Sequence, residues 1–448
     1  METPEKQTQP GFFQSNTARM IMVGMLTLIL LIPLFFVQDL IKERSIRQKE
    51  VVSETTGKWG KNVYFYGPII KVPYKTYTET VSINEKTKVA TTEKTTATEY
   101  AYFFPQTLKN NSDVTTKPLK RSNYESVVFT AKMKFEGNYL KPDFSPKNIP
   151  DADIEWNKAT ILIHTTNLKS IRDEVKIKLG ANSYVFEPVY NTEQDSVEAL
   201  ETGYIDAIAL HDNVSTNFNF NITYNGSGQI KMVPIGKTTD AHMTSNWNSP
   251  SFTGNFLPDD KTKVITDKNF VADWKVLHIN RAFSQQSFEV LPDLKQYAFG
   301  VDFYLPVNQY VQNDRASKYG FLVIGLTFLI FFLIQTISKI KIHIFQYTMI
   351  GLALIMFYTL LISITEHSSF MLAYLISGVS VIALISLYSV SILKNRKFPV
   401  FIALSLTALY GFIYVIIQLE NYALLFGSIG LFLILGAVMY FSRKIDWN

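Results

Sequence analysis

The sequence contains no cysteine. Disulfide bonds, thiolate metal sites and cysteine nucleophiles are therefore excluded, and any domain outside the cytoplasm must be held together by its core alone. Histidine is also scarce and scattered. It shows no His-Glu-x-x-His motif and no close pair on one helical face, which argues against a zinc enzyme. The histidines are at positions 164, 211, 242, 278, 343 and 367.

Other signatures of chemistry are missing as well. No phosphate-binding Gly-Lys-Ser or Gly-Lys-Thr occurs, and the Gly-Ser-Gly at residues 226–228 lies in a predicted turn rather than in a nucleophile elbow. The net charge of +5 comes without a basic recognition helix or a known nucleic-acid-binding module. The sequence therefore predicts no enzyme, no cofactor, no metal site and no nucleic-acid partner.

Charged side chains are absent from six long apolar runs. A membrane-spanning helix needs about 20 such residues, and each run is close to that length. No small-residue cleavage pattern follows the first run, which predicts an uncleaved anchor. The runs are Met20–Val37, Tyr319–Ile337, Ile344–Ile364, Phe370–Leu393, Phe398–Ile417 and Ala423–Phe441.

The short loops between the last five runs alternate in charge. Two loops and the C-terminal tail are basic, through Lys339 and Lys341, then Lys394, Arg396 and Lys397, then Arg443 and Lys444. The other two loops contain no lysine or arginine. Because excess lysine and arginine stay in the cytoplasm, this alternation places the C-terminus inside. Six spans then place the N-terminus inside and residues 38–318 outside.

The lysines and arginines around the first run favour the opposite orientation for that span. Two precede it and four follow it, namely Lys6 and Arg19, then Lys42, Arg44, Arg47 and Lys49. The three concordant loops outweigh them, since a large following domain weakens the rule. The predicted organisation is a cytoplasmic tail (1–19), a first transmembrane helix (20–37), an external domain (38–318), a five-helix bundle (319–441) and a second tail (442–448).

The external segment changes its period near residue 58. Before that point it reads as a helix continuing out of the membrane, and beyond it apolar and polar residues alternate, as in residues 127–136 and 217–224. Asn225-Gly226 predicts a hairpin with the following run, and the polar stretch 76–99 predicts an exposed edge hairpin. The predicted fold class is an α-helical multi-pass membrane protein, six spans arranged as one plus five, with a large inserted antiparallel β domain that is sandwich-like.

Six stretches that run through both the membrane and the external parts form a recognisable set. They are residues 57–74, 102–139, 272–281, 299–332, 373–378 and 409–447, which include YGPIIKVPY, ADWKVLHINR and LYGFIYVIIQLENYALLFGSIG. On these stretches nearly the whole chain resembles the CreD family of bacterial inner-membrane proteins. The chain departs from the family pattern at two places. The family usually has an aspartate where this chain has Asn421, and an arginine-glycine pair near the position of Arg121-Ser122. The resemblance implies an inner-membrane location, a periplasmic β domain and an association with cell-envelope integrity, and it implies no catalytic site.

The topology gathers charged and polar residues on the outer membrane surface. Glu420 lies in the short link between the last two runs, so it reads as a hairpin tip rather than as a charge in the hydrocarbon. We hypothesise that acids at the hairpin tips pair with bases of the stalks and fix the β domain on the bundle. The alternative is that all are solvated loop residues. The predicted cluster comprises Glu366, His367, Gln418, Glu420, Asn421, Arg315, Lys318, Arg44 and Arg47.

The predicted function is a non-enzymatic role in envelope integrity or envelope stress, with the lipid bilayer as one partner. Binding or transport of a lipid or envelope precursor is one alternative, and a membrane sensor or scaffold for a protein partner is another. Ala403, Thr407 and Gly411 recur every four residues, which predicts a close helix contact. The sequence does not determine the oligomeric state.

Overall fold

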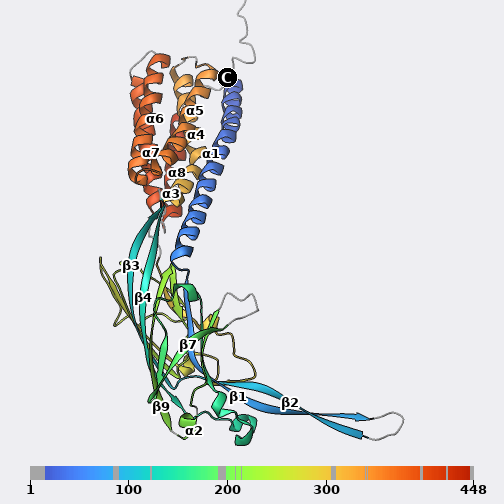
Figure 1. The fold of residues 1–448 in the computed structure, drawn as a ribbon. Coiled ribbons are helices and arrows are strands. Elements are labelled where there is room, and N and C mark those ends of the chain that lie inside the picture. Colours follow the sequence, from blue (N-terminus) through green and yellow to red (C-terminus); the bar gives the residue numbers. More distant parts are fainter. Residues whose placement is uncertain are drawn as a thin grey trace, which may run out of the picture. The chain divides into compact units, whose positions relative to one another are not determined.

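A computed structural model gives the fold as two compact units (Figure 1). The helical unit comprises residues 1–50 and 307–448, and the β unit comprises residues 51–306. Residues 307–318, predicted as part of the external domain, therefore belong to the helical unit. The structure describes residues 16–83, 90–121, 124–189, 198–206, 208–212, 214–303, 309–338, 340, 342–393, 397–419 and 422–443.

Six helices in these ranges are long and apolar enough to cross a membrane. One is N-terminal and five are C-terminal, which confirms the predicted fold class. The short helix α3 directly precedes α4. The helices with residues in this unit are α1 (Asn16–Trp59), α3 (Gln309–Lys318), α4 (Gly320–Ser338), α5 (Ile344–Thr365), α6 (Phe370–Leu393), α7 (Lys397–Gln418) and α8 (Ala423–Ser442).

Two glycines let α1 lie close to the C-terminal helices. A Cβ at Gly351 of α5 would overlap Leu30 Cδ1, and one at Gly320 of α4 would lie 2.7 Å from Leu34 Cδ1. Leu30 and Leu34 are both almost fully buried. Because apolar burial between helices gives little gain in lipid, such close van der Waals packing is what holds membrane helices together.

The predicted contact through Ala403, Thr407 and Gly411 is not formed. In the described part of the chain, no atom of another element lies within 4 Å of a Cβ placed at Gly411, and Thr407 is exposed. Helix α7 packs through its larger residues instead, including Ile402, Leu406 and Ile413. Shape complementarity of large side chains, which the spacing of small residues does not report, decides which face of α7 is buried.

The β unit is built from one long sheet that includes all sixteen strands of the described residues. Most neighbouring strands are antiparallel, while β1 with β10 and β3 with β11 are parallel. The strands are β1 (Val63–Ile83), β2 (Ala90–Phe103), β3 (Thr107–Arg121), β4 (Tyr124–Leu140), β5 (Thr160–Thr165), β6 (Lys176–Leu179), β7 (Asn182–Val189), β8 (Glu198–Thr202), β9 (Ser215–Ser227), β10 (Gln229–Met232), β11 (Thr238–Ser245), β12 (Ser251–Gly254), β13 (Val264–Ile265), β14 (Phe270–Leu277), β15 (Gln286–Phe288) and β16 (Phe299–Asp302), with the short helix α2 (Ile208–Asp212) between β8 and β9.

The two halves of this sheet face each other around an aromatic core. The Phe135 ring of β4 stacks on Phe65 of β1 at 4.4 Å and on Phe220 of β9 at 4.7 Å between ring centroids. The alternation read from the sequence is confirmed over residues 131–136 and 217–222, where Met133, Phe135, Phe218 and their alternate neighbours are buried while the intervening residues are exposed. Val128, an intervening residue of the predicted run, is buried. Large aromatic side chains thus stabilise this cysteine-free unit.

The polar stretch 76–99 forms the predicted hairpin. Strands β1 and β2 pair in one register from Ile70 with Phe103 to Ile83 with Ala90. Figure 1 shows this two-stranded ribbon projecting from the other strands of the β unit. The side chains of Glu93 and Lys94 are exposed, as its polar composition predicts.

The hairpin predicted at Asn225-Gly226 is wrong. Both residues lie inside β9, and the chain turns one residue after its end, at Gly228, where φ is +71°. Strand β10 then pairs with β1 and β16 instead of β9. Gly226 is required for another reason, because a Cβ there would overlap the ring of Phe129. The dipeptide therefore reflects close packing rather than a two-residue turn.

Candidate functional site

Helix α3 buries a face that is partly polar. Tyr310, Asn313, Ala316 and Ser317 are buried and follow helical spacing, so they lie on one side of the helix. The helix packs against α4, α5, α6 and α7. Asn313 and Ser317 are fully buried, which is costly for polar groups unless they are hydrogen-bonded. This face of α3 is therefore the centre of the candidate site.

Polar contacts join α3 to three other helices of the unit. Gln38 Nε2 of α1 donates to the Ser317 carbonyl at 3.0 Å. Gln312 Nε2 donates to Gln418 Oε1 of α7 at 3.4 Å. On α5, Thr365 Oγ1 lies 3.4 Å from Asn313 Oδ1. Each contact alone contributes about 0.5 to 1.5 kcal/mol, but together they connect both ends of the sequence to one short helix.

One ion pair of the predicted cluster is formed within the helical unit. Arg44 Nε of α1 lies 3.6 Å from Glu366 Oε1, and the two side chains are 46% and 23% exposed. Glu366 caps the C-terminus of α5, where the helix dipole disfavours a negative charge. A nearby guanidinium offsets that cost. An exposed pair of this kind contributes about 0 to 1 kcal/mol, so it orients α1 more than it stabilises the protein.

The other predicted bases have partners closer in sequence. Arg47 pairs with Glu50 at 3.2 Å, and Lys318 pairs with Asp314 at 2.7 Å. Arg315 lies on α3 and is half-buried, and His367 is exposed directly after Glu366. Glu420 and Asn421 lie outside the described residues. The structure thus pairs Arg44 with Glu366 and joins Gln418 to α3. It adds five residues that sequence reasoning missed: Gln38, Gln312, Asn313, Ser317 and Thr365.

A sequence signal exists for the three missed residues that lie on α3. Polar side chains at residues 309–317 precede an apolar run and recur at helical spacing. From sequence alone, a polar helix at the end of a membrane span is predicted to be exposed to solvent, unless the segments that cover it are known. The burial of Asn313 therefore follows from the assembly of the helices and not from local pattern.

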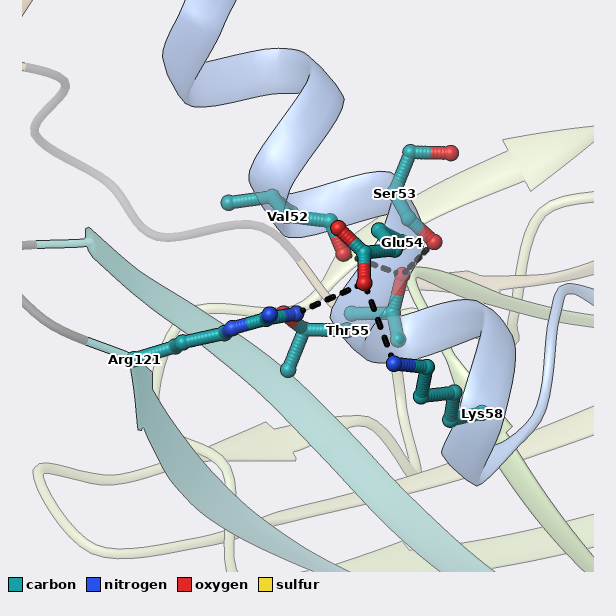
Figure 2. A network of polar contacts seen from close by, with 7 residues as sticks. Val52, Ser53, Glu54, Thr55, Lys58 and Arg121 are labelled. Atoms are coloured by element: carbon teal, nitrogen blue, oxygen red, sulfur yellow. Dashed lines mark hydrogen bonds and ion pairs between the residues drawn. The ribbon is translucent and has the colours of Figure 1, made fainter.

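The C-terminal end of α1 is anchored separately, within the β unit (Figure 2). Glu54 pairs with Lys58 at 3.0 Å and with Arg121 of β3 at 3.1 Å, and Arg121 also donates to Thr55 Oγ1. The hydrogen bond from Lys58, followed by the one from Arg121, lowers the pKa of the Glu54 carboxyl. The contact keeps this carboxylate ionised to lower pH.

An aromatic side chain completes this anchor. Trp59 Nε1 donates to the Phe129 carbonyl at 3.2 Å, and Lys117 Nζ lies 3.9 Å from the Trp59 ring centroid. A cation over an indole face adds about 0.5 to 1 kcal/mol at an exposed site. The last turn of α1 is therefore held by β3 and β4 through both polar and ring contacts.

Both clusters consist of groups that join one element to another. Within the ranges that the structure describes, no group of three or more histidine, aspartate or glutamate side chains is arranged to hold a metal ion. The groups around α3 include amides, hydroxyls and ion pairs, which suit helix-to-helix contacts. The chemistry of both sites is that of attachment.

The comparison with known families decides the identity. The family model described as inner membrane protein CreD matches residues 15–448. The chain belongs to the CreD family. It is 27% identical over 428 residues to the inner membrane protein CreD of Escherichia coli (strain K12), a match that covers 94% of this chain and 91% of that one. With its six apolar helices, this CreD-family member is a multi-pass inner-membrane protein in contact with the lipid bilayer.

Proposed function

We propose that this chain is a non-enzymatic protein of the inner membrane that supports the integrity of the cell envelope. In this proposal residues 38–318 are periplasmic, both termini are cytoplasmic, and the helical unit supports the β unit through helix α1. The orientation is supported by the basic loops around Lys339, Arg396 and Arg443. The family association with envelope integrity supports the role.

One observation carries the proposal: α1 is a continuous helix with a separate anchor in each unit. In the helical unit, Leu30 packs against Gly351 of α5, and Gln38 donates a hydrogen bond to α3. Arg44 pairs with Glu366 at the C-terminus of α5. In the β unit, Glu54 and Trp59 contact β3 and β4. Both sets of contacts belong to one uninterrupted helix, so the chain passes from one unit to the other without a flexible linker.

The experiment breaks α1 between its two anchors. Lys49 and Glu50 are both exposed. The double variant Lys49→Gly with Glu50→Pro costs the helix about 4 kcal/mol, while Lys49→Ala with Glu50→Ala removes the same charges and keeps the helix. Both are expressed in cells that lack the protein, under an envelope stress that prevents those cells from growing.

We expect the alanine pair to restore growth and the Gly-Pro pair to fail. Limited proteolysis of membranes is the folding control, since each unit has its own core and should remain protease-resistant in both variants. Full rescue by the Gly-Pro pair would show that a continuous α1 is not needed, and the proposed mechanical role would then be abandoned.

A further inference from the structure

A small space lies between the two halves of the β sheet. Strands β10 and β16 line one side and β3, β4, β11 and β14 line the other. Its apolar lining includes the methionines at positions 133, 232 and 243. The space has room for about one water molecule.

Two buried N–H donors border this space without an acceptor among the residues that the structure describes. Asn110 and Trp274 are 2% and 3% exposed, and neither Asn110 Nδ2 nor Trp274 Nε1 has a hydrogen-bond partner. Both residues line the pocket. The Asn110 amide is already oriented, because its Oδ1 accepts from Ser112 Oγ at 2.7 Å. A buried donor without an acceptor loses its hydration with no compensation, so such groups are rare in folded proteins.

The strand register explains how the two donors come to share one space. Asn110 of β3 lies opposite Ala241 of β11, and Ala241 lies opposite Trp274 of β14. All three side chains are on the buried face. Strands are about 4.8 Å apart, so the two outer backbones are about 10 Å apart with only a methyl group between them. The small side chain of Ala241 therefore leaves a gap between an amide and an indole.

We propose that this gap binds one water molecule, whose oxygen accepts hydrogen bonds from Asn110 Nδ2 and Trp274 Nε1. The two unpaired groups are donors, so the occupant must accept hydrogen bonds, which a metal cation cannot do. The water joins β3 to β14 across β11. The apolar methionines on the remaining sides keep the site closed to larger polar ligands.

The test replaces the water with a group of the protein. Threonine and valine have the same shape, and both would fill the gap at residue 241. The hydroxyl of Ala241→Thr offers an acceptor to the two donors, whereas Ala241→Val leaves them unpaired. At an ordinary apolar position the hydroxyl is unfavourable. We therefore expect Ala241→Thr to be more stable than Ala241→Val by at least fivefold in the unfolding equilibrium constant of the full chain in detergent.

The same pair of variants at Ala272 is the control. Ala272 is fully buried on β14 and does not line the pocket. There we expect the ordinary order, with valine more stable than threonine. The same order at residue 241 would overturn the proposal. A density map of the wild-type full chain gives an independent answer: a peak within hydrogen-bond distance of both donors supports the site, and an empty gap contradicts it.

Discussion

Arg281 is the one lysine or arginine that is buried among the residues the structure describes, with 6% exposure. Its Nη2 donates to the carbonyls of Gly236 at 2.7 Å and Ile235 at 3.3 Å and to Gln285, and its guanidinium stacks on the Phe283 ring. Within the described ranges its Nε and Nη1 have no hydrogen-bond partner, and no ion pair there includes it. Burial lowers the pKa of Arg281 to about 10, which shows that the charged form is disfavoured.

The neutral variant Arg281→Met should therefore keep the stability of the β unit. The carbonyls of Gly236 and Ile235 have second donors in Thr239 Oγ1 and Gln285 Nε2. Methionine fills most of the space without a buried charge, so we expect the free energy of unfolding to change by less than about 1 kcal/mol or to rise. Arg281→Ala should lower it by about 2 to 4 kcal/mol through the cavity that it leaves.

Denaturant unfolding of the full chain in detergent, read by pulse proteolysis, measures these differences. Arg172→Met, at an exposed position, is the matched control and should change stability by less than about 0.5 kcal/mol. If Arg281→Met is as damaging as Arg281→Ala, the hydrogen bonds of the guanidinium outweigh its desolvation, and the charge is stabilising after all.

Single residues also show what the sequence did and did not predict at the candidate site. Charge and topology were enough to place Arg44 and Glu366 on one surface, and the structure pairs them. The partners of Gln38 and Asn313 were not predictable, because they depend on how α3 lies on the other helices. Opposite charges indicate a contact over long sequence separations, whereas neutral amides give no such signal.

At the scale of the element, the contact of α1 with α4 and α5 depends on a missing side chain. A Cβ at Gly351 would overlap Leu30 Cδ1 and lie 2.9 Å from Phe328 Cζ. Gly351→Leu should therefore force α1 away and lower the free energy of unfolding of the helical unit by about 1 to 3 kcal/mol. Adding Leu30→Ala should restore part of the loss, because it returns space to the same contact.

Unfolding of the protein from mild detergent by titrated dodecyl sulfate measures both effects. Gly411→Leu is the matched control, since no atom lies within 4 Å of a Cβ at that position, and it should be nearly silent. Equal losses at residues 351 and 411 would mean that leucine disturbs any glycine of these helices, and the specific role of Gly351 would be refuted.

Elements with a strong period were predicted well, and those defined by their neighbours were not. The alternation of β4 and β9 and the apolar runs of α4 to α8 follow directly from the positions of the residues. The pairing partner of β10 could not be predicted in this way, because its four residues fit several registers. The glycines before it are also required for close packing and not only for a turn. The position of a short strand is determined by the strands with which it pairs.

At the scale of the whole molecule, the lack of cysteine makes the proposed orientation directly testable. Any cysteine introduced is the only thiol in the chain. Thr95 is an exposed residue of β2, and Asn395 lies in the basic link before α7. The positive-inside rule predicts that these two positions lie on opposite sides of the inner membrane, and the bases that follow the first span favour the reverse arrangement at the N-terminus.

A membrane-impermeant maleimide, applied to cells with a permeabilised outer membrane, should label Thr95→Cys at once. It should label Asn395→Cys and Gln14→Cys only after the inner membrane is broken. Labelling of Asn395→Cys in intact cells with protection of Thr95→Cys would invert the whole topology. Labelling of both Gln14→Cys and Thr95→Cys in intact cells, with Asn395→Cys protected, would instead mean that the first helix does not cross the membrane.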